Sequence, residues 1–352
     1  MHPSKPGRLV AALGMVGIVS ALYTGGVLYA QQQPTRRQVE PELAGTLPYA
    51  TTNGPTQHIV VQVGDGGSGP YKSVLVGDPN LKTHTLYRPR DLTVFGANLK
   101  MPIVAYGNGA CRNASYEVRN FLTEVASHGF LVIAIGPAIP TIAGGSYVSG
   151  PTKSVQLLDA VDWATAENVR QGSDLYGRVD TSKIAVMGHS CGGLQAIEVS
   201  TDPRVTTTVM LNSGILGARP VPSSGAPQAG APAAGRGGAG GMSGMPAVTK
   251  DQLAKLHAPI AYIIGGKSDI AHDNAADDFA KIESVPVVMA NREVGHYPAT
   301  FLDERGGAWG EAASAWLLWQ LKGDQAAAGM FTGVNCGLCG DPRWTIEKKK
   351  IP

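Results

Sequence analysis

The sequence predicts an α/β fold with a mostly parallel central sheet and helices on both faces of the sheet. From Met101 onward, short apolar strands alternate with helix-compatible segments, a pattern typical of parallel sheets. One strand, Ile184–Met187, runs into Gly188-His189-Ser190-Cys191-Gly192 and then into a further apolar segment that suits a helix. The 352 residues are 43% hydrophobic and 16% charged, which suits a globular protein with a large core.

Residues 1–30 predict an export signal. Lys5 and Arg8 precede an uncharged apolar run that ends at Ala30, where we expect cleavage. The run is also long enough to span a bilayer as an uncleaved anchor, and we expect no other contact with a membrane. We therefore expect a secreted or periplasmic protein, in which a flexible leader over residues 31–56 follows the signal.

Three strands should open the folded domain, which we place at residues 57–325. They are predicted at His58–Val63, Tyr71–Val76 and His84–Pro89. The glycine-rich run between the first two lacks the lysine and the helix start of a phosphate-binding loop, so we interpret it as a turn.

The alternating region follows these strands. Its strands are predicted at Pro102–Tyr106, Leu131–Ile135, Ile184–Met187, Val205–Leu211, Pro259–Ile264 and Val285–Ala290. Three helices are indicated by apolar residues at helical spacing, at Val118, Phe121, Leu122 and Val125, at Leu157, Val161 and Ala164, and at Ala312, Ala315, Trp316 and Trp319.

Two segments depart from the alternation. Residues 217–246 are rich in glycine, proline and alanine, and we expect a mobile loop there, either an inert insertion or a flap over the substrate. Residues 326–352 are interpreted as a C-terminal tail that holds Cys336-Gly337-Leu338-Cys339, and Lys348–Lys350 is expected to be a solvated tip.

The motif around Ser190 is G-x-S-x-G in the strand–turn–helix context that a nucleophile elbow requires. A serine at the tip of such a turn sits in strained backbone, and small neighbours let the chain segments approach each other. The helix that starts behind the serine also directs N–H groups toward negative charge that develops there.

A serine hydroxyl is a weak nucleophile, so it needs a base, and the base needs an orienting acid. Asp269 and His296 each follow a predicted strand, in the order expected after such an elbow, and we assign them as acid and base. Asp273 is the alternative acid and His272 the alternative base. We expect no direct chemical role for His189, although it lies inside the motif.

The charge that develops on a substrate carbonyl oxygen needs two N–H donors. One should be the N–H of Cys191, directly after the nucleophile. The other should come from the glycine-rich turn after the strand at Pro102–Tyr106, where Ala110 is the first choice and Cys111 the second.

Together these residues resemble the α/β-hydrolases, in particular the branch of dienelactone hydrolases, chlorophyllases and polyester hydrolases. The resemblance covers about residues 58–323 and is carried by Leu86-Tyr87-Arg88-Pro89, Asn108-Gly109-Ala110, Ser127-His128-Gly129-Phe130 and Gly188-His189-Ser190-Cys191-Gly192. It implies a Ser-His-Asp hydrolase that acts on esters. Many polyester hydrolases have an aromatic residue at the position of Ala110 and a methionine at the position of Cys191. Because this sequence differs at both positions, we do not infer polymer cleavage from the resemblance.

Four cysteines allow three disulfide connectivities. Cys111 and Cys191 belong to the two loops expected to meet over the substrate oxygen, so we expect a disulfide between them. Cys336 and Cys339 are then expected to form a structural disulfide in the tail, and the alternative is that they form a redox motif.

The sequence thus predicts an exported serine hydrolase that cleaves a small-molecule or polymeric carboxylic ester and needs no cofactor or metal. Amide or thioester cleavage by the same triad, a non-catalytic binding module on this fold, and a thiol–disulfide protein are the alternatives. The formal net charge of +2 does not favour nucleic acid as a partner.

Overall fold

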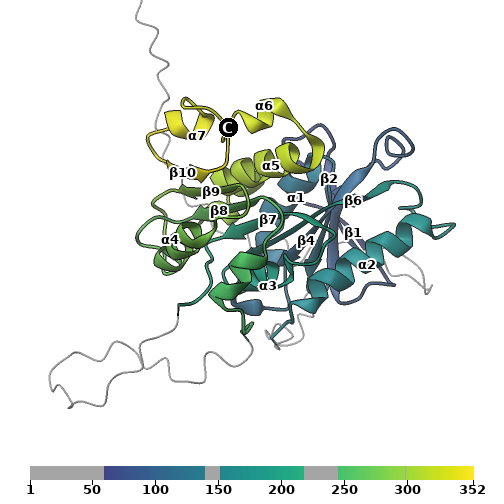
Figure 1. Ribbon diagram of the computed structural model, residues 1–352. Helices are drawn as coiled ribbons and strands as arrows, with labels where there is room; N and C mark the ends of the chain where they lie inside the picture. The colour runs from purple at the N-terminus through teal and green to yellow at the C-terminus, as the bar shows by residue number, and fades with distance from the viewer. Residues whose placement is uncertain (1–58, 139–150, 218–244, 298) are drawn as a thin grey trace, which may run out of the picture. The chain divides into compact units, whose positions relative to one another are not determined.

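A ten-stranded sheet forms the centre of the computed structural model (Figure 1), which describes residues 59–138, 151–217, 245–297 and 299–352. The predicted signal, the leader and nearly all of the loop at 217–246 lie outside these residues. The strands are β1 (Ile59–Gln62), β2 (Ser73–Gly77), β3 (His84–Pro89), β4 (Met101–Gly107), β5 (Leu131–Ile135), β6 (Val179–His189), β7 (Val205–Leu211), β8 (Ile260–Ile264), β9 (Val287–Asn291) and β10 (Thr345–Lys349).

The helices that connect these strands are mostly short. The α-helices are α1 (Arg119–Ser127), α2 (Val155–Val169), α3 (Cys191–Val199), α4 (His272–Lys281), α5 (Gly307–Lys322), α6 (Gln325–Ala328) and α7 (Gly337–Gly340). Short 3₁₀ segments lie at η2 (Gly109–Cys111), η3 (Tyr116–Val118), η4 (Lys250–Lys255), η5 (Ala299–Phe301) and η6 (Glu304–Gly306).

The strands follow one another across the sheet in the order β1-β2-β3-β5-β4-β6-β7-β8-β9-β10. The pairs from β5 to β9 are parallel, and the pairs outside them are antiparallel. Because β6, β7, β8 and β9 run in the same direction, the loops that follow them gather at one edge of the sheet. This edge carries the site described below.

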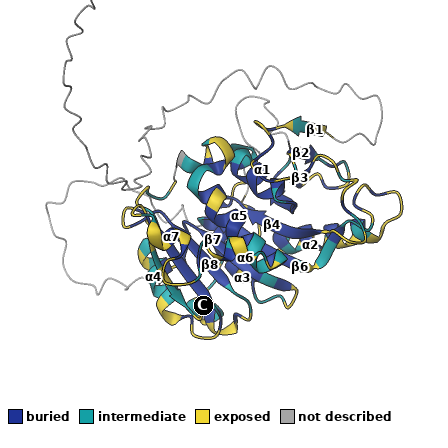
Figure 2. Cartoon of the chain, turned by 90° about the horizontal axis from the view of Figure 1, so that it is seen from above, coloured by how far each residue is buried: buried dark blue, intermediate teal, exposed yellow. Residues whose placement is uncertain are grey.

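Both faces of the sheet are covered, as the sequence predicted. Val104 and Tyr106 of β4 belong to a core shared with α1 and α5, whereas Ile103 and Ala105 belong to a core shared with α2 and α3. Such alternation is what a strand buried on both sides requires. Strands β4 and β8 are accordingly buried along their whole length, and all but one residue of β7 is buried (Figure 2).

The C-terminal segment is part of the central sheet, contrary to the prediction from the sequence. Residues 326–352 were expected to form a tail outside the domain, but β10 pairs with β9 as the last strand of the sheet, within the same compact unit. Lys348 and Lys349 are not a solvated tip either. Lys348 Nζ donates to the Phe331 carbonyl oxygen at 2.9 Å, and Lys349 Nζ donates to that of Ala280 at 2.9 Å.

None of the helices within the described ranges is both long enough and apolar enough to cross a membrane.

Candidate active site

Ser190 lies at the sharp turn between strand β6 and helix α3. Its backbone has a φ of 52° and a ψ of −117°, a region that residues other than glycine avoid, so the turn is strained at the serine. A Cβ atom on Gly188 would lie 2.1 Å from the Gly192 carbonyl oxygen, and one on Gly192 would lie 2.1 Å from the Gly107 carbonyl oxygen. Glycine at both positions therefore lets the end of β4 pack directly against the start of α3.

Three loops at the same edge of the sheet bring a serine, a histidine and an aspartate into one chain of hydrogen bonds. The loops follow the parallel strands β6, β8 and β9. Ser190 Oγ lies 2.9 Å from His296 Nε2, and His296 Nδ1 lies 2.6 Å from Asp269 Oδ1. A ring nitrogen must carry its proton to bond a carboxylate, so Nδ1 donates to Asp269 and Nε2 accepts from the serine hydroxyl. These are the three residues that the sequence predicted as nucleophile, base and acid.

The Asp269 carboxylate is buried and accepts four hydrogen bonds. Besides the bond from His296, Oδ1 accepts one from the Ala271 N–H at 2.9 Å. Oδ2 accepts from Asn212 Nδ2 at 2.8 Å and from the Gly265 N–H at 3.0 Å. Burial alone raises the pKa of Asp269, but the hydrogen bonds, that from His296 foremost, outweigh it and lower the pKa to about 2. The acid is therefore ionised at neutral pH.

The alternative acid and base do not take part in this hydrogen-bond chain. The Asp273 side chain is fully exposed, and its Oδ1 lies 3.0 Å from His272 Nδ1. The two alternatives thus pair with each other at the start of α4.

His189 supports the loop that carries His296. The residue is buried, and its Nε2 lies 3.0 Å from the His296 carbonyl oxygen, to which it donates. Burial lowers the pKa of His189 to about 4, so the ring is neutral at neutral pH. Its ring packs edge-on against Tyr297 and Phe301, with centroids 5.4 and 5.0 Å away.

The turn after β4 has an unusual backbone that Asn108 stabilises. Ala110 and Cys111 both lie in the left-handed region, with φ of 54° and 48°. The buried Asn108 side chain donates from Nδ2 to the carbonyl oxygens of Arg112 at 2.9 Å and Ile135 at 2.6 Å. A side chain from within the turn therefore fixes its path between β4 and the end of β5.

The hydrogen bonds of this turn distinguish its two candidate oxyanion donors. The Cys111 N–H already donates to the Asn108 carbonyl oxygen at 3.2 Å. Among the residues that the structure describes, the N–H groups of Ala110 and Cys191 have no hydrogen-bond partner. The geometry therefore favours Ala110 over Cys111 as the companion of Cys191.

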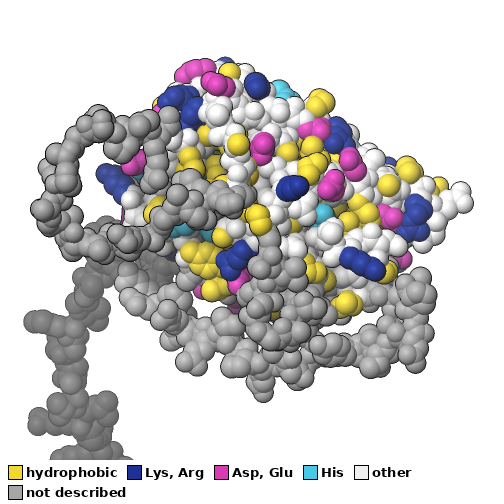
Figure 3. Space-filling view, turned by 90° about the horizontal axis from the view of Figure 1, so that it is seen from below, with side chains coloured by type: hydrophobic (Ala, Val, Ile, Leu, Met, Phe, Trp, Pro, Cys, Tyr) yellow, Lys and Arg dark blue, Asp and Glu magenta, His cyan; other side chains and the backbone are white. Residues whose placement is uncertain are grey.

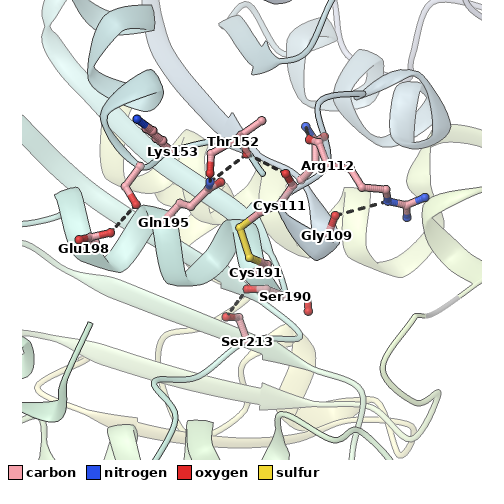
Figure 4. Close-up of a disulfide and its surroundings, with 12 residues drawn as sticks. Gly109, Cys111, Arg112, Thr152, Lys153, Ser190, Cys191, Gln195, Glu198 and Ser213 are labelled. Carbon is pink, nitrogen blue, oxygen red and sulfur yellow. Dashed lines mark hydrogen bonds between the residues drawn. A yellow bond between two sulfur atoms is a disulfide. The ribbon is translucent and has the colours of Figure 1, made fainter. Parts of the chain in front are cut away.

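A disulfide joins the turn after β4 to the start of α3 (Figure 4). It links Cys111 to Cys191, whose Cα atoms lie 5.1 Å apart, and this is the pairing that the sequence predicted. The Cys111 carbonyl oxygen accepts hydrogen bonds from the N–H and the Oγ1 of Thr152, both at 3.0 Å. Gln195 of α3 donates in turn to the Thr152 carbonyl oxygen at 2.9 Å. The two candidate oxyanion segments are thus held together covalently and by hydrogen bonds.

The second disulfide links Cys336 to Cys339 in the C-terminal segment. It closes one short turn at α7, where the Cys339 N–H donates to Cys336 Sγ at 3.2 Å. No group of three or more His, Cys, Asp and Glu side chains in the described ranges is placed to hold a metal ion.

Sequence reasoning missed three residues of the site. Ser213 Oγ donates to the Ser190 carbonyl oxygen at 2.7 Å (Figure 4), Asn212 contacts Asp269, and Trp309 contacts Asn212. Asn212 and Ser213 carry no carboxylate, so a search for the acid after each strand does not select them. Their place directly after β7, at the edge of the sheet where the other loops meet, was the signal that could have identified them.

Comparison with known proteins agrees with this architecture. Residues 93–212 match the protein family described as PETase, PET hydrolase-like. The chain has the α/β-hydrolase fold. It also resembles the polyester-hydrolase branch of that fold, as the sequence analysis inferred.

The chain is also similar to the cutinases est1 and est2 of Thermobifida alba. Each is 28% identical to it over 151 residues, which is 42% of this chain and 44% of the relative. The chain therefore matches less than half of the length of these cutinases. The family match includes Ala110, Cys111, Ser190 and Cys191, whereas Asp269 and His296 lie beyond it.

Proposed function

We propose that this α/β-hydrolase is an exported serine hydrolase that cleaves carboxylic esters through an acyl-enzyme intermediate on Ser190. One observation carries the proposal, the continuous hydrogen-bond chain from Ser190 Oγ through His296 to the ionised Asp269. A strained serine aligned with a base and an acid is the arrangement that activates a hydroxyl group for attack.

In the proposed reaction, Ser190 Oγ attacks the ester carbonyl carbon while His296 Nε2 takes the hydroxyl proton. The tetrahedral intermediate collapses by breaking the bond to the alcohol oxygen, and His296 delivers the proton to the departing alcohol. A water molecule then attacks the acyl group in the same way, releasing the acid and restoring the serine. Asp269 stays ionised throughout and stabilises the protonated imidazole.

The N–H groups of Ala110 and Cys191 are the proposed donors to the oxyanion. Both belong to backbone held by the Cys111–Cys191 disulfide, so the donors do not have to be ordered during the reaction. Preorganised donors of this kind contribute about 10²–10³-fold each to the rate.

The surroundings of the triad suit an apolar ester. Ile270 follows the acid and is 78% exposed, and Val294 and Tyr297 flank the base with 37% and 41% exposed. Hydrophobic side chains form several patches on the face shown in Figure 3. The matches to a PET hydrolase-like family and to cutinases support esters over amides or thioesters.

Export is part of the proposal. The two basic residues and the apolar run of residues 1–30 suit a signal or an anchor. The two disulfides suit an oxidising compartment.

A panel of nitrophenyl esters of increasing acyl length, with matched anilides and thioesters, tests this function. We expect ester hydrolysis by the wild-type protein and a loss of at least about 10⁴-fold in kcat for Ser190→Ala. Ser182→Ala, at an exposed position of the same strand, is the control and should retain full activity. Hydrolysis that survives Ser190→Ala would contradict the assignment, and anilide or thioester cleavage without ester cleavage would favour the alternative reactions.

A further inference from the structure

Asn212 follows strand β7 directly and lies between the acid and the base. Its backbone is in the left-handed region, with a φ of 46°, and the residue is fully buried. Its Nδ2 donates to Asp269 Oδ2 at 2.8 Å and to the Gly295 carbonyl oxygen at 3.0 Å. Because Gly295 immediately precedes His296, a single amide group contacts both the acid and the loop that carries the base.

The indole ring of Trp309 fixes the orientation of this amide. Trp309 Nε1 lies 2.8 Å from Asn212 Oδ1, and both side chains are fully buried. An indole N–H can only donate, so its partner must be the amide oxygen, and the NH₂ group must then face Asp269 and Gly295. Turning the amide over would break all three hydrogen bonds and place its oxygen against the carboxylate.

Gly265 leaves the space that the amide occupies. A Cβ atom at this position would lie 1.9 Å from the Gly295 carbonyl oxygen and 2.9 Å from Asn212 Nδ2. Its N–H donates to Asp269 Oδ2 at 3.0 Å, and its carbonyl oxygen accepts from the Gly295 N–H at 2.8 Å. The loops after β7, β8 and β9 thus meet around one side-chain amide.

We propose that Asn212 is a positioning residue for the triad and that Trp309 holds it in the orientation that the triad needs. The inference rests on the proposed function, since it concerns how Asp269 and His296 act together. By bonding Oδ2, the amide leaves Oδ1 for His296 and favours the ionised acid while the imidazole is protonated. By bonding the Gly295 carbonyl oxygen, it also holds the base at a fixed distance from the acid.

Asn212→Asp tests the donor directly. It keeps an oxygen for Trp309 but replaces the NH₂ group with a second carboxyl oxygen, which donates to Asp269 only when protonated. At about pH 8 we expect kcat to fall about 10–100-fold with KM nearly unchanged. Relative to the wild type, the loss should shrink as the pH is lowered, because the new carboxyl group takes up a proton and restores the bond.

Trp309→Phe tests the orientation of the amide and has a matched control in the same helix. Trp316 of α5 is also fully buried, and its Nε1 donates to Thr207 Oγ1 at the same distance of 2.8 Å. Both substitutions to Phe remove one buried N–H bond, so similar losses of thermal stability are expected. Only Trp309→Phe should lower kcat, by about 5–10-fold, whereas Trp316→Phe should stay within about 2-fold of the wild type.

The proton NMR signal of His296 Nδ1–H reports on the hydrogen bond to Asp269 without any substrate. It should move in Asn212→Asp and Trp309→Phe and stay in place in Trp316→Phe. Equal kcat values and equal spectra for the two tryptophan variants would overturn the inference. A pH profile of Asn212→Asp that matches the wild type would do the same. Neither outcome would contradict the proposed ester function, because the wild-type enzyme would still be active. If the wild type cleaves no ester but the signal responds as expected, the ester function fails and the positioning role stands.

Discussion

At the residue scale, His189 is a buried histidine directly before Ser190 whose contacts are structural. It is 3% exposed, and its Nε2 donates a hydrogen bond to the His296 carbonyl oxygen. With a pKa of about 4, set chiefly by burial, the ring stays neutral at neutral pH. Its contribution is to hold the backbone of His296, whose own ring contacts the serine.

The buried neutral state of His189 makes the protein sensitive to acid. In the unfolded chain a histidine takes up its proton near pH 6.5, whereas the folded protein resists this until about pH 4. Below about pH 6.5 the unfolded state therefore binds more protons, and folding stability falls as the pH is lowered toward 4. For this single group the loss amounts to about 2–3 kcal/mol at pH 4.

Denaturant unfolding at pH 7 and pH 4 measures this effect. His189→Gln keeps a donor for the His296 carbonyl oxygen but cannot be protonated, so its free energy of unfolding should fall by about 2–3 kcal/mol less than that of the wild type over this range. Identical pH dependence in the two proteins would show that His189 is not held neutral.

At the element scale, the turn after β4 and the start of α3 act as one unit. The Cys111–Cys191 disulfide closes a separation of 80 residues, and the Cys336–Cys339 disulfide closes a separation of 3. Loop entropy predicts about 4.5 kcal/mol of stabilisation for the first and about 1.6 kcal/mol for the second. Only the first lies beside the proposed oxyanion donors.

Replacing each pair with serine separates these two effects. For Cys111→Ser with Cys191→Ser we expect a large drop in Tm and a loss of about 10-fold or more in kcat, because both donor segments lose their common anchor. For Cys336→Ser with Cys339→Ser we expect a small drop in Tm and unchanged kcat. Thermal unfolding and ester hydrolysis at a temperature where both variants are folded provide the measurements, and equal kcat values would contradict the role given to the first disulfide.

At the scale of the whole molecule, the sequence predicted the parallel centre of the sheet because most of its strands are runs of apolar and β-branched residues. Leu131–Ile135 and Val205–Leu211 have the bounds that the pattern indicated. That Ser190, Asp269 and His296 lie together could be predicted for a related reason, since each follows such a strand and the ends of parallel strands share one edge. Strand β10 was missed because Thr345–Lys349 alternates polar and apolar residues only weakly and pairs through its backbone at the edge of the sheet.

The remaining parts of the site depend on contacts between distant residues. Asn212 and Trp309 are 97 positions apart, and nothing in the local pattern of α5 marks Trp309 as different from Trp316. Trp309 also packs against Trp344 with ring centroids 5.5 Å apart, so the C-terminal segment contacts the side chain that holds Asn212 beside Asp269. Such a network is set by packing in three dimensions.

The most direct test of the account is the site of covalent labelling by a fluorophosphonate. We predict that the reagent modifies the wild-type protein once, that mass spectrometry of the digested protein places the label on Ser190, and that Ser190→Ala takes up none. Because the reagent reports an activated serine without any choice of ester, substrate specificity does not affect the result. An unlabelled wild-type protein, or a label on another serine, would contradict the claim that Ser190, His296 and Asp269 form a working catalytic triad.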